Sequence, residues 1–193
     1  MEILIGEVRA LIEDFLRKGK ELFSYDSDNI FPLTENNIIE DSGEVYRNGI
    51  KMTSGYSIDY NVNKVTITDS LDVGDNVEIR YNYYLHYSDT EIQEYINGAL
   101  IYLSINNIGA QAFEIISGEI YPTPKDRQRR LIAIISAILI KPNLSSYVTP
   151  DFSIRFTTNE SKDVKIKKTI RDYKRRLGIF SEIDIKESYE WGE

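Results

Sequence analysis

The chain has 193 residues, 41% of them hydrophobic and 28% charged, which is typical of a folded globular protein of one domain or slightly more. It contains no Cys, which excludes disulfide scaffolds, thiolate zinc sites and Cys nucleophiles. The acidic start and the short apolar run at residues 131–140 argue against a signal peptide and a membrane span. We expect a protein made in the cytoplasm that contacts no membrane.

The formal net charge of −8 is unevenly distributed along the chain. Residues 21–89 hold 13 acids and 4 bases, whereas residues 125–176 hold 14 bases and 5 acids, and the C-terminus is acidic again. Such blocks are either solvated faces or the surfaces through which copies or partners meet opposite charge.

The N-terminal residues 2–18 are predicted to form an amphipathic helix, because apolar residues recur at helical spacing from Leu4 onward. Gly19 is the expected helix stop. Residues 20–43 are polar and are expected to form a connector, with a short extended piece at residues 30–33.

Residues 45–82 are predicted to form three or four antiparallel strands, because apolar residues alternate from Tyr56 to Tyr81. Asn48-Gly49 is a strong hairpin signal, since a type I′ turn needs positive φ at both central positions. A β-module of this size is marginal alone, so we expect it to lean on the helices or on a neighbouring copy.

Two further helices follow the β-module. A capping box at Ser88 starts a helix that is expected to end near Gly109, and residues 110–121 are expected to add a short helical continuation. Thr123 is the expected N-cap of the next helix, which ends at Pro142. That helix is apolar on all sides, so it is either the central helix of a bundle or partly buried by another subunit.

Residues 143–158 are expected to be extended, and residues 160–177 to form a basic helix with one apolar stripe. Its cations are interpreted in three ways: as a solvated surface, as a surface for DNA phosphates, or as contacts to an acidic part of the adjacent subunit. The candidate contact residues are Lys165, Lys168, Arg171, Lys174 and Arg175.

The predicted fold class is therefore α+β, a bundle of about four helices with an inserted antiparallel β-module. The helical body comprises residues 1–19 and 88–178, and the connector and β-module comprise residues 20–87. Residues 179–193 are expected to form an extended C-terminal arm. Tyr189 and Trp191 are its candidate partner anchors.

The sequence contains no motif that is typical of a catalytic, phosphate-binding or metal-binding site. The single His, His86, has no nucleophile motif near it, and there is no glycine-rich phosphate loop. Asp26-Ser27-Asp28 resembles the start of a calcium loop but lacks the required Gly and the later Glu. We predict no catalytic, cofactor-binding or metal-binding residues, and no enzymatic activity.

Two segments carry a family resemblance. The capped helix SDTEIQEYINGALIYL resembles the central helix of head–tail connector (adaptor) proteins of tailed bacteriophages. The segment EVYRNGIKMTSGYSIDYNVNKVTITDSLDVGDNVEIRYNY resembles a β-unit that recurs in phage virion proteins. The matching residues are Val45, Tyr46, Asn48, Gly49, Tyr56, Tyr60, Val65, Ile67, Gly74, Asp75, Val77, Ile79 and Tyr81.

The resemblance implies a structural protein of the virion neck. Such a protein forms a ring, usually a dodecamer, that joins the portal to tail or stopper proteins and surrounds the DNA exit channel. The alternatives are a tail or baseplate structural protein and a soluble nucleic-acid-binding module. Typical small adaptors are nearly all helical, so the inserted β-module departs from the family pattern.

Overall fold

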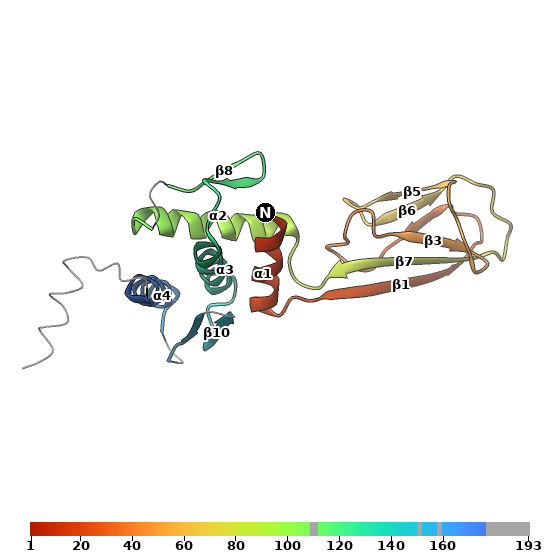
Figure 1. Ribbon diagram of the computed structural model, residues 1–193. Helices are drawn as coiled ribbons and strands as arrows, with labels where there is room; N and C mark the ends of the chain where they lie inside the picture. The colour runs from red at the N-terminus through yellow and green to blue at the C-terminus, as the bar shows by residue number, and fades with distance from the viewer. Residues whose placement is uncertain (109–111, 150–151, 158–159, 177–193) are drawn as a thin grey trace, which may run out of the picture. The chain divides into compact units, whose positions relative to one another are not determined.

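A computed structural model describes residues 1–108, 112–149, 152–157 and 160–176. The fold is mixed α+β, with four helices and several small antiparallel sheets in the described residues (Figure 1). The chain divides into two compact units. Met1–Glu13 and Asp89–Glu193 form the first, here called the helical unit, and Asp14–Ser88 form the second, the β unit.

The helical unit contains four helices and two short hairpins. The helices are α1 (Glu2–Ile12), α2 (Asp89–Ile105), α3 (Asp126–Ile140) and α4 (Lys162–Arg176). The hairpins are β8 (Glu114–Ile116) with β9 (Glu119–Tyr121), and β10 (Ser146–Thr149) with β11 (Phe152–Arg155).

Helix α3 is the centre of this unit and packs against α1, α2 and α4. All eight residues from 131 to 138 are buried. The one polar member, Ser136, donates its hydroxyl to the Ile132 carbonyl 2.9 Å away, so no buried hydroxyl is left without a partner there. The helix predicted to be apolar on all sides is thus covered by its own chain, and no second subunit is needed to bury it.

Helix α1 is shorter than predicted. It ends at Ile12, because Glu13 adopts a left-handed φ of 59° and its N–H returns to the last turn of the helix. Lys141 donates its ammonium to the Ile12 carbonyl and satisfies a further group at this helix end. Phe15, which fits the apolar period of the sequence, is 63% exposed. The expected boundary at Gly19 is therefore wrong, and residues 14–19 belong to the β unit.

Two other expectations for the helical unit are also wrong. Residues 110–121 do not continue a helix, since their described part forms the β8–β9 hairpin, whose turn has positive φ at Ser117 and Gly118. Thr123 is not the N-cap of α3, because the helix begins at Asp126 and Gln128 accepts from the Lys125 N–H at 2.9 Å.

The β unit contains seven strands in two sheets, more than the sequence predicted. The strands are β1 (Leu16–Ser24), β2 (Ile30–Pro32), β3 (Glu44–Arg47), β4 (Ile50–Lys51), β5 (Tyr56–Asp59), β6 (Lys64–Ile67) and β7 (Asn76–Tyr84). One sheet has the order β1-β7-β3-β4 and the other β2-β6-β5, and all neighbouring strands in both are antiparallel.

Side chains of both sheets meet in a single core, so the β unit has a hydrophobic core of its own. The expected connector supplies much of it, because Phe31, Leu33 and Ile38 are buried there. The other core residues are Val45, Val65, Ile67, Val77, Ile79, Tyr81 and Tyr83.

The Asn48-Gly49 turn is confirmed, with φ values of 51° and 80°. The Asn48 side chain donates to Asp75 Oδ1 at 2.6 Å and accepts from the Asn76 N–H at 2.9 Å. These bonds tie the β3–β4 hairpin to the turn before β7. Asn48 and Asp75 therefore have a structural role, because they join two turns of the β unit.

Gly19 has a packing role in the middle of β1. It pairs with Tyr81 on β7, and a Cβ atom at position 19 would lie only 2.4 Å from Cε2 of the Tyr81 ring. The ring crosses the strand at this point, and the hydroxyl donates to Glu21 Oε1 at 2.9 Å. Tyr81 is 3% exposed, so its ring has little room to move aside.

We expect Gly19→Ala to lower the free energy of unfolding of the β unit by about 1–3 kcal/mol, because the new methyl group overlaps the Tyr81 ring. The matched control is Gly6→Ala in α1, where a Cβ meets no atom within 4 Å. That variant should be more stable by about 0.5–1 kcal/mol, since glycine is unfavourable within a helix. Urea unfolding measures both, and equal effects of the two substitutions would contradict this account.

Asp75 gives the β unit a pH dependence. Hydrogen bonds from the Asp72 N–H and the Asn48 amide, with Arg47 nearby, hold the pKa of Asp75 below its ordinary value. The stabilisation is therefore present above the unfolded carboxyl pKa of about 3.9 and is lost as the pH falls through the folded value. Asp75→Asn should destabilise the β unit more at neutral pH than at about pH 3. A stability difference that stays the same at both pH values would show that the charge of Asp75 contributes nothing.

Candidate functional site

The exposed side of α4 is the strongest candidate for a functional surface. Ile166, Ile170 and Tyr173 are buried on one side of the helix. The opposite side presents four cations at intervals of four, three and one residues, which places them on one face. This basic face consists of Lys167, Arg171, Lys174 and Arg175. None of the four forms an ion pair with any residue that the structure describes.

The helix end explains part of this charge but not all of it. Cations in the last turn of a helix interact favourably with its negative C-terminal end, and Lys174 and Arg175 lie in the last turn of α4. Lys167 and Arg171 lie before that turn, so the helix dipole does not account for them.

The start of α3 brings another cation toward the C-terminal part of α4. Burial raises the pKa of Tyr173, and Arg127 is close enough to oppose that shift. At its other end, α4 contacts the segment that follows α3 through Lys165. The two helices are therefore antiparallel, and Arg127 is exposed at the start of α3.

Lys165 is not a surface contact, and its prediction as one is wrong. The side chain is fully buried, at 1% exposed, and its ammonium donates to the carbonyls of Pro142 and Leu144. The ammonium also lies 5.3 Å from the centre of the Phe156 ring. Lys165 therefore holds the segment after α3 against α4, because its ammonium donates to two carbonyl groups that lie beyond the C-terminal end of α3.

Lys168 is also engaged within the chain. Its ammonium lies 3.5 Å from Glu160 Oε1 and donates to the Arg155 carbonyl at 3.2 Å. Hydrogen bonds from Thr157, aided by Lys168, lower the pKa of Glu160. Of the predicted contact residues, the structure thus brings Arg171, Lys174 and Arg175 together. Lys167 was missed, although its helical spacing from Arg171 could have identified it.

Tyr189 and Trp191, the predicted partner anchors, lie outside the described residues, as do Gly109 and the end of the expected last helix at Leu177.

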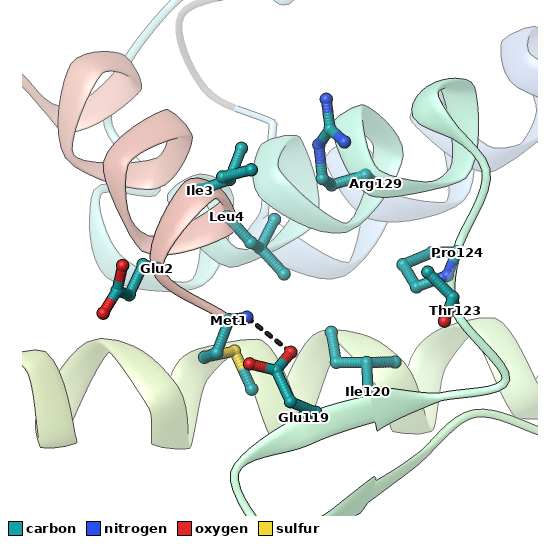
Figure 2. A pocket seen from close by; sticks show the side chains of 9 residues that line it. All are labelled: Met1, Glu2, Ile3, Leu4, Glu119, Ile120, Thr123, Pro124 and Arg129. Atoms are coloured by element: carbon teal, nitrogen blue, oxygen red, sulfur yellow. Dashed lines mark hydrogen bonds and ion pairs between the residues drawn. The ribbon is translucent and has the colours of Figure 1, made fainter.

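A hollow lies between the starts of α1 and α3 and strand β9, with an open volume of about 600 Å³ (Figure 2). Its walls are largely apolar, and several of its charges are paired within the unit. The Met1 ammonium lies 2.6 Å from Glu119, and Arg129 contacts Glu7 at 3.0 Å and Asp126 at 3.1 Å. The cations of this hollow are thus paired with carboxylates of the same unit. Its lining residues offer no evident acid–base or nucleophilic pair.

The described residues contain no group of three or more His, Asp or Glu side chains placed to hold a metal ion. No helix in the described part of the chain is both long and apolar enough to cross a bilayer.

No protein-family model matches the chain, and a comparison with curated protein sequences finds no match either.

We expect Lys165→Met to lower the free energy of unfolding of the helical unit by about 1–3 kcal/mol, because it leaves two partly buried carbonyls without this donor while keeping most of the side-chain volume. Lys167→Met on the exposed side of the same helix is the control, with an expected effect within about 0.5 kcal/mol. Urea unfolding followed by circular dichroism distinguishes them. Equal stability of the two variants would mean that Lys165 holds nothing in place.

Proposed function

We propose that this chain is a head–tail connector (adaptor) protein, a structural protein of the virion neck. Copies of the chain form a ring that joins the portal to tail or stopper proteins and surrounds the DNA exit channel. In this proposal the helical unit is the four-helix body, the β unit is an insertion that supplies lateral or tail-side contacts, and residues 179–193 are an extended arm with Tyr189 and Trp191 as anchors.

The observation that supports this proposal is the basic face of α4. Four cations without ion partners among the described residues lie along one side of a helix whose other side is packed. Repeated around a ring, such faces would give a band of positive charge. Phosphate contacts of this kind attract duplex DNA without reading its bases, which suits a channel through which DNA must move.

The β unit supports the proposal through its architecture. Asn48 and Asp75 belong to the pattern that resembles phage virion proteins, and both are used to lock two turns together. A rigid module of this kind is suited to a contact surface rather than to chemistry. The second candidate, a soluble nucleic-acid-binding module, draws on the same basic face and differs in needing no ring.

The test is assembly with the portal protein of the same virion, measured by native mass spectrometry. We expect a defined complex that contains several copies of the chain per portal ring. If no complex forms at any ratio, the adaptor assignment fails. Salt-sensitive DNA binding by a monomer, without portal binding, would instead support the soluble module.

DNA binding by the assembled ring should depend on the basic face. Lys167→Glu with Arg171→Glu reverses two exposed cations that hold no internal contact, so ring formation should persist. The slope of log affinity against log salt should weaken by about two per copy engaged with DNA. The control is Lys51→Glu with Lys64→Glu in the β unit, two exposed cations outside α4 and β1, which makes the same charge change elsewhere. Equal losses from both pairs would show that only total charge matters.

A further inference from the structure

Strand β1 has one open edge. All nine of its residues pair with β7, and it is the first strand in the order of its sheet. No described strand pairs with its other side, and Figure 1 shows it at the margin of the sheet beside β7. Such an edge presents unpaired N–H and C=O groups over a length that could accept another strand.

The side chains of β1 include exposed apolar residues as well as cations. Leu16 and Leu22 are 52% and 65% exposed, on the same face of the sheet as Lys18 and Lys20. Lys20 is paired with Glu78 at 3.0 Å. Arg17 and Lys18 are exposed and have no ion partner in the described part of the chain. The edge therefore combines apolar surface with free positive charge, which favours an acidic strand and disfavours a second β1.

The chain itself contains a segment with the complementary pattern. Residues 182–187 read Glu-Ile-Asp-Ile-Lys-Glu, an alternation of charged and apolar residues with the period of a strand. The arm, residues 179–193, holds five acids and one base. In a strand, this pattern would put Glu182 and Asp184 on one face and Ile183 and Ile185 on the other.

We propose that residues 182–187 of a second copy add to the open edge of β1 as an antiparallel or parallel strand. The acids would lie on the outer face beside Lys18, and Arg17, one residue away on the other face, adds positive charge to the same edge. The isoleucines would lie on the inner face, where Gly19 has no side chain and where the ring of Tyr81 and the half-buried Phe23 form the margin of the core.

This inference rests on the proposed ring of identical copies. The arm of one copy and the β1 edge of the next are different surfaces, so the contact is heterologous. Contacts of that type close into rings when the rotation between copies allows it. The arm would then join neighbouring subunits, and the basic face would remain available to DNA.

The test uses a chain that ends after Gly178 and a fluorescent peptide of residues 179–193. Circular dichroism first checks that the shortened chain melts as the full chain does. Anisotropy should then show saturable peptide binding. Arg17→Glu with Lys18→Glu should weaken it by at least about tenfold, and Lys167→Glu with Arg171→Glu by less than about threefold. The reverse ranking would place the arm on the basic face of α4 and overturn the proposal.

Proline separates strand pairing from charge attraction. A peptide with Ile185→Pro loses a backbone donor and the extended geometry, whereas Ile185→Ala loses only side-chain contact, and both keep every charge. The proline peptide should bind at least about tenfold more weakly than the alanine peptide. Equal affinities would mean that no strand forms.

Experiments on the full chain distinguish binding of the arm to a second copy from binding of the arm to its own β1. Sedimentation of rings assembled on the portal should reveal their loss when Arg17 and Lys18 are both changed to Glu. Normal rings from that variant would overturn the inference and leave the adaptor proposal intact. Peptide binding without any portal complex would do the opposite, and a monomeric full chain that excludes added peptide would show that each arm binds its own β1.

Discussion

The pairing of β1 with β7 is the constraint on which the two-unit organisation depends. It runs without a break from Leu16 opposite Tyr84 to Ser24 opposite Asn76. Paired strands lie about 5 Å apart, so the chain leaves the helical unit after Glu13 and returns at Asp89 through neighbouring strands. Arg9, which is buried, contacts Asp89 at 2.6 Å and so joins α1 to the start of α2 across the insertion. The helical unit can therefore be continuous in space although 75 residues of sequence interrupt it.

The same two strands organise the interior of the β unit. Strand β7 lies between β1 and β3 and supplies alternate residues to the core from Val77 to Tyr83. The glycine in β1 gives the Tyr81 ring the room to lie across the strand. Around β7, the exposed face of this sheet carries paired charges: Lys20 contacts Glu78, Glu78 contacts Arg80, and Arg80 lies 4.4 Å from the Tyr46 ring. On one side of the open edge of β1 lie the exposed Leu16, Lys18 and Leu22, and on the other side lies the margin of the core.

Sequence reasoning succeeded where the signal was local. The Asn48-Gly49 hairpin, the alternation that leads into β7, the apolar run of α3 and the stripe of α4 all follow from residue type and period. Strand β1 was missed because LRKGKELFS has no apolar alternation, and its strand character comes from pairing with residues about sixty positions away. Lys165 shows the same limit. Its position beside Ile166 suggested a surface cation, but the carbonyls that it binds belong to a segment that only the tertiary structure brings near.

The central claim is that the β unit is an inserted unit with its own core, and that the helical unit folds without it. The most direct test replaces residues 14–88 by a short Gly-Ser linker and follows the thermal melt by circular dichroism. The account predicts a strong helical signal that is lost in one cooperative transition, because α1, α2, α3 and α4 keep all their mutual contacts. A chain with little helical signal, or one that melts without cooperativity, would contradict the account and show that the helical unit needs the β unit to fold.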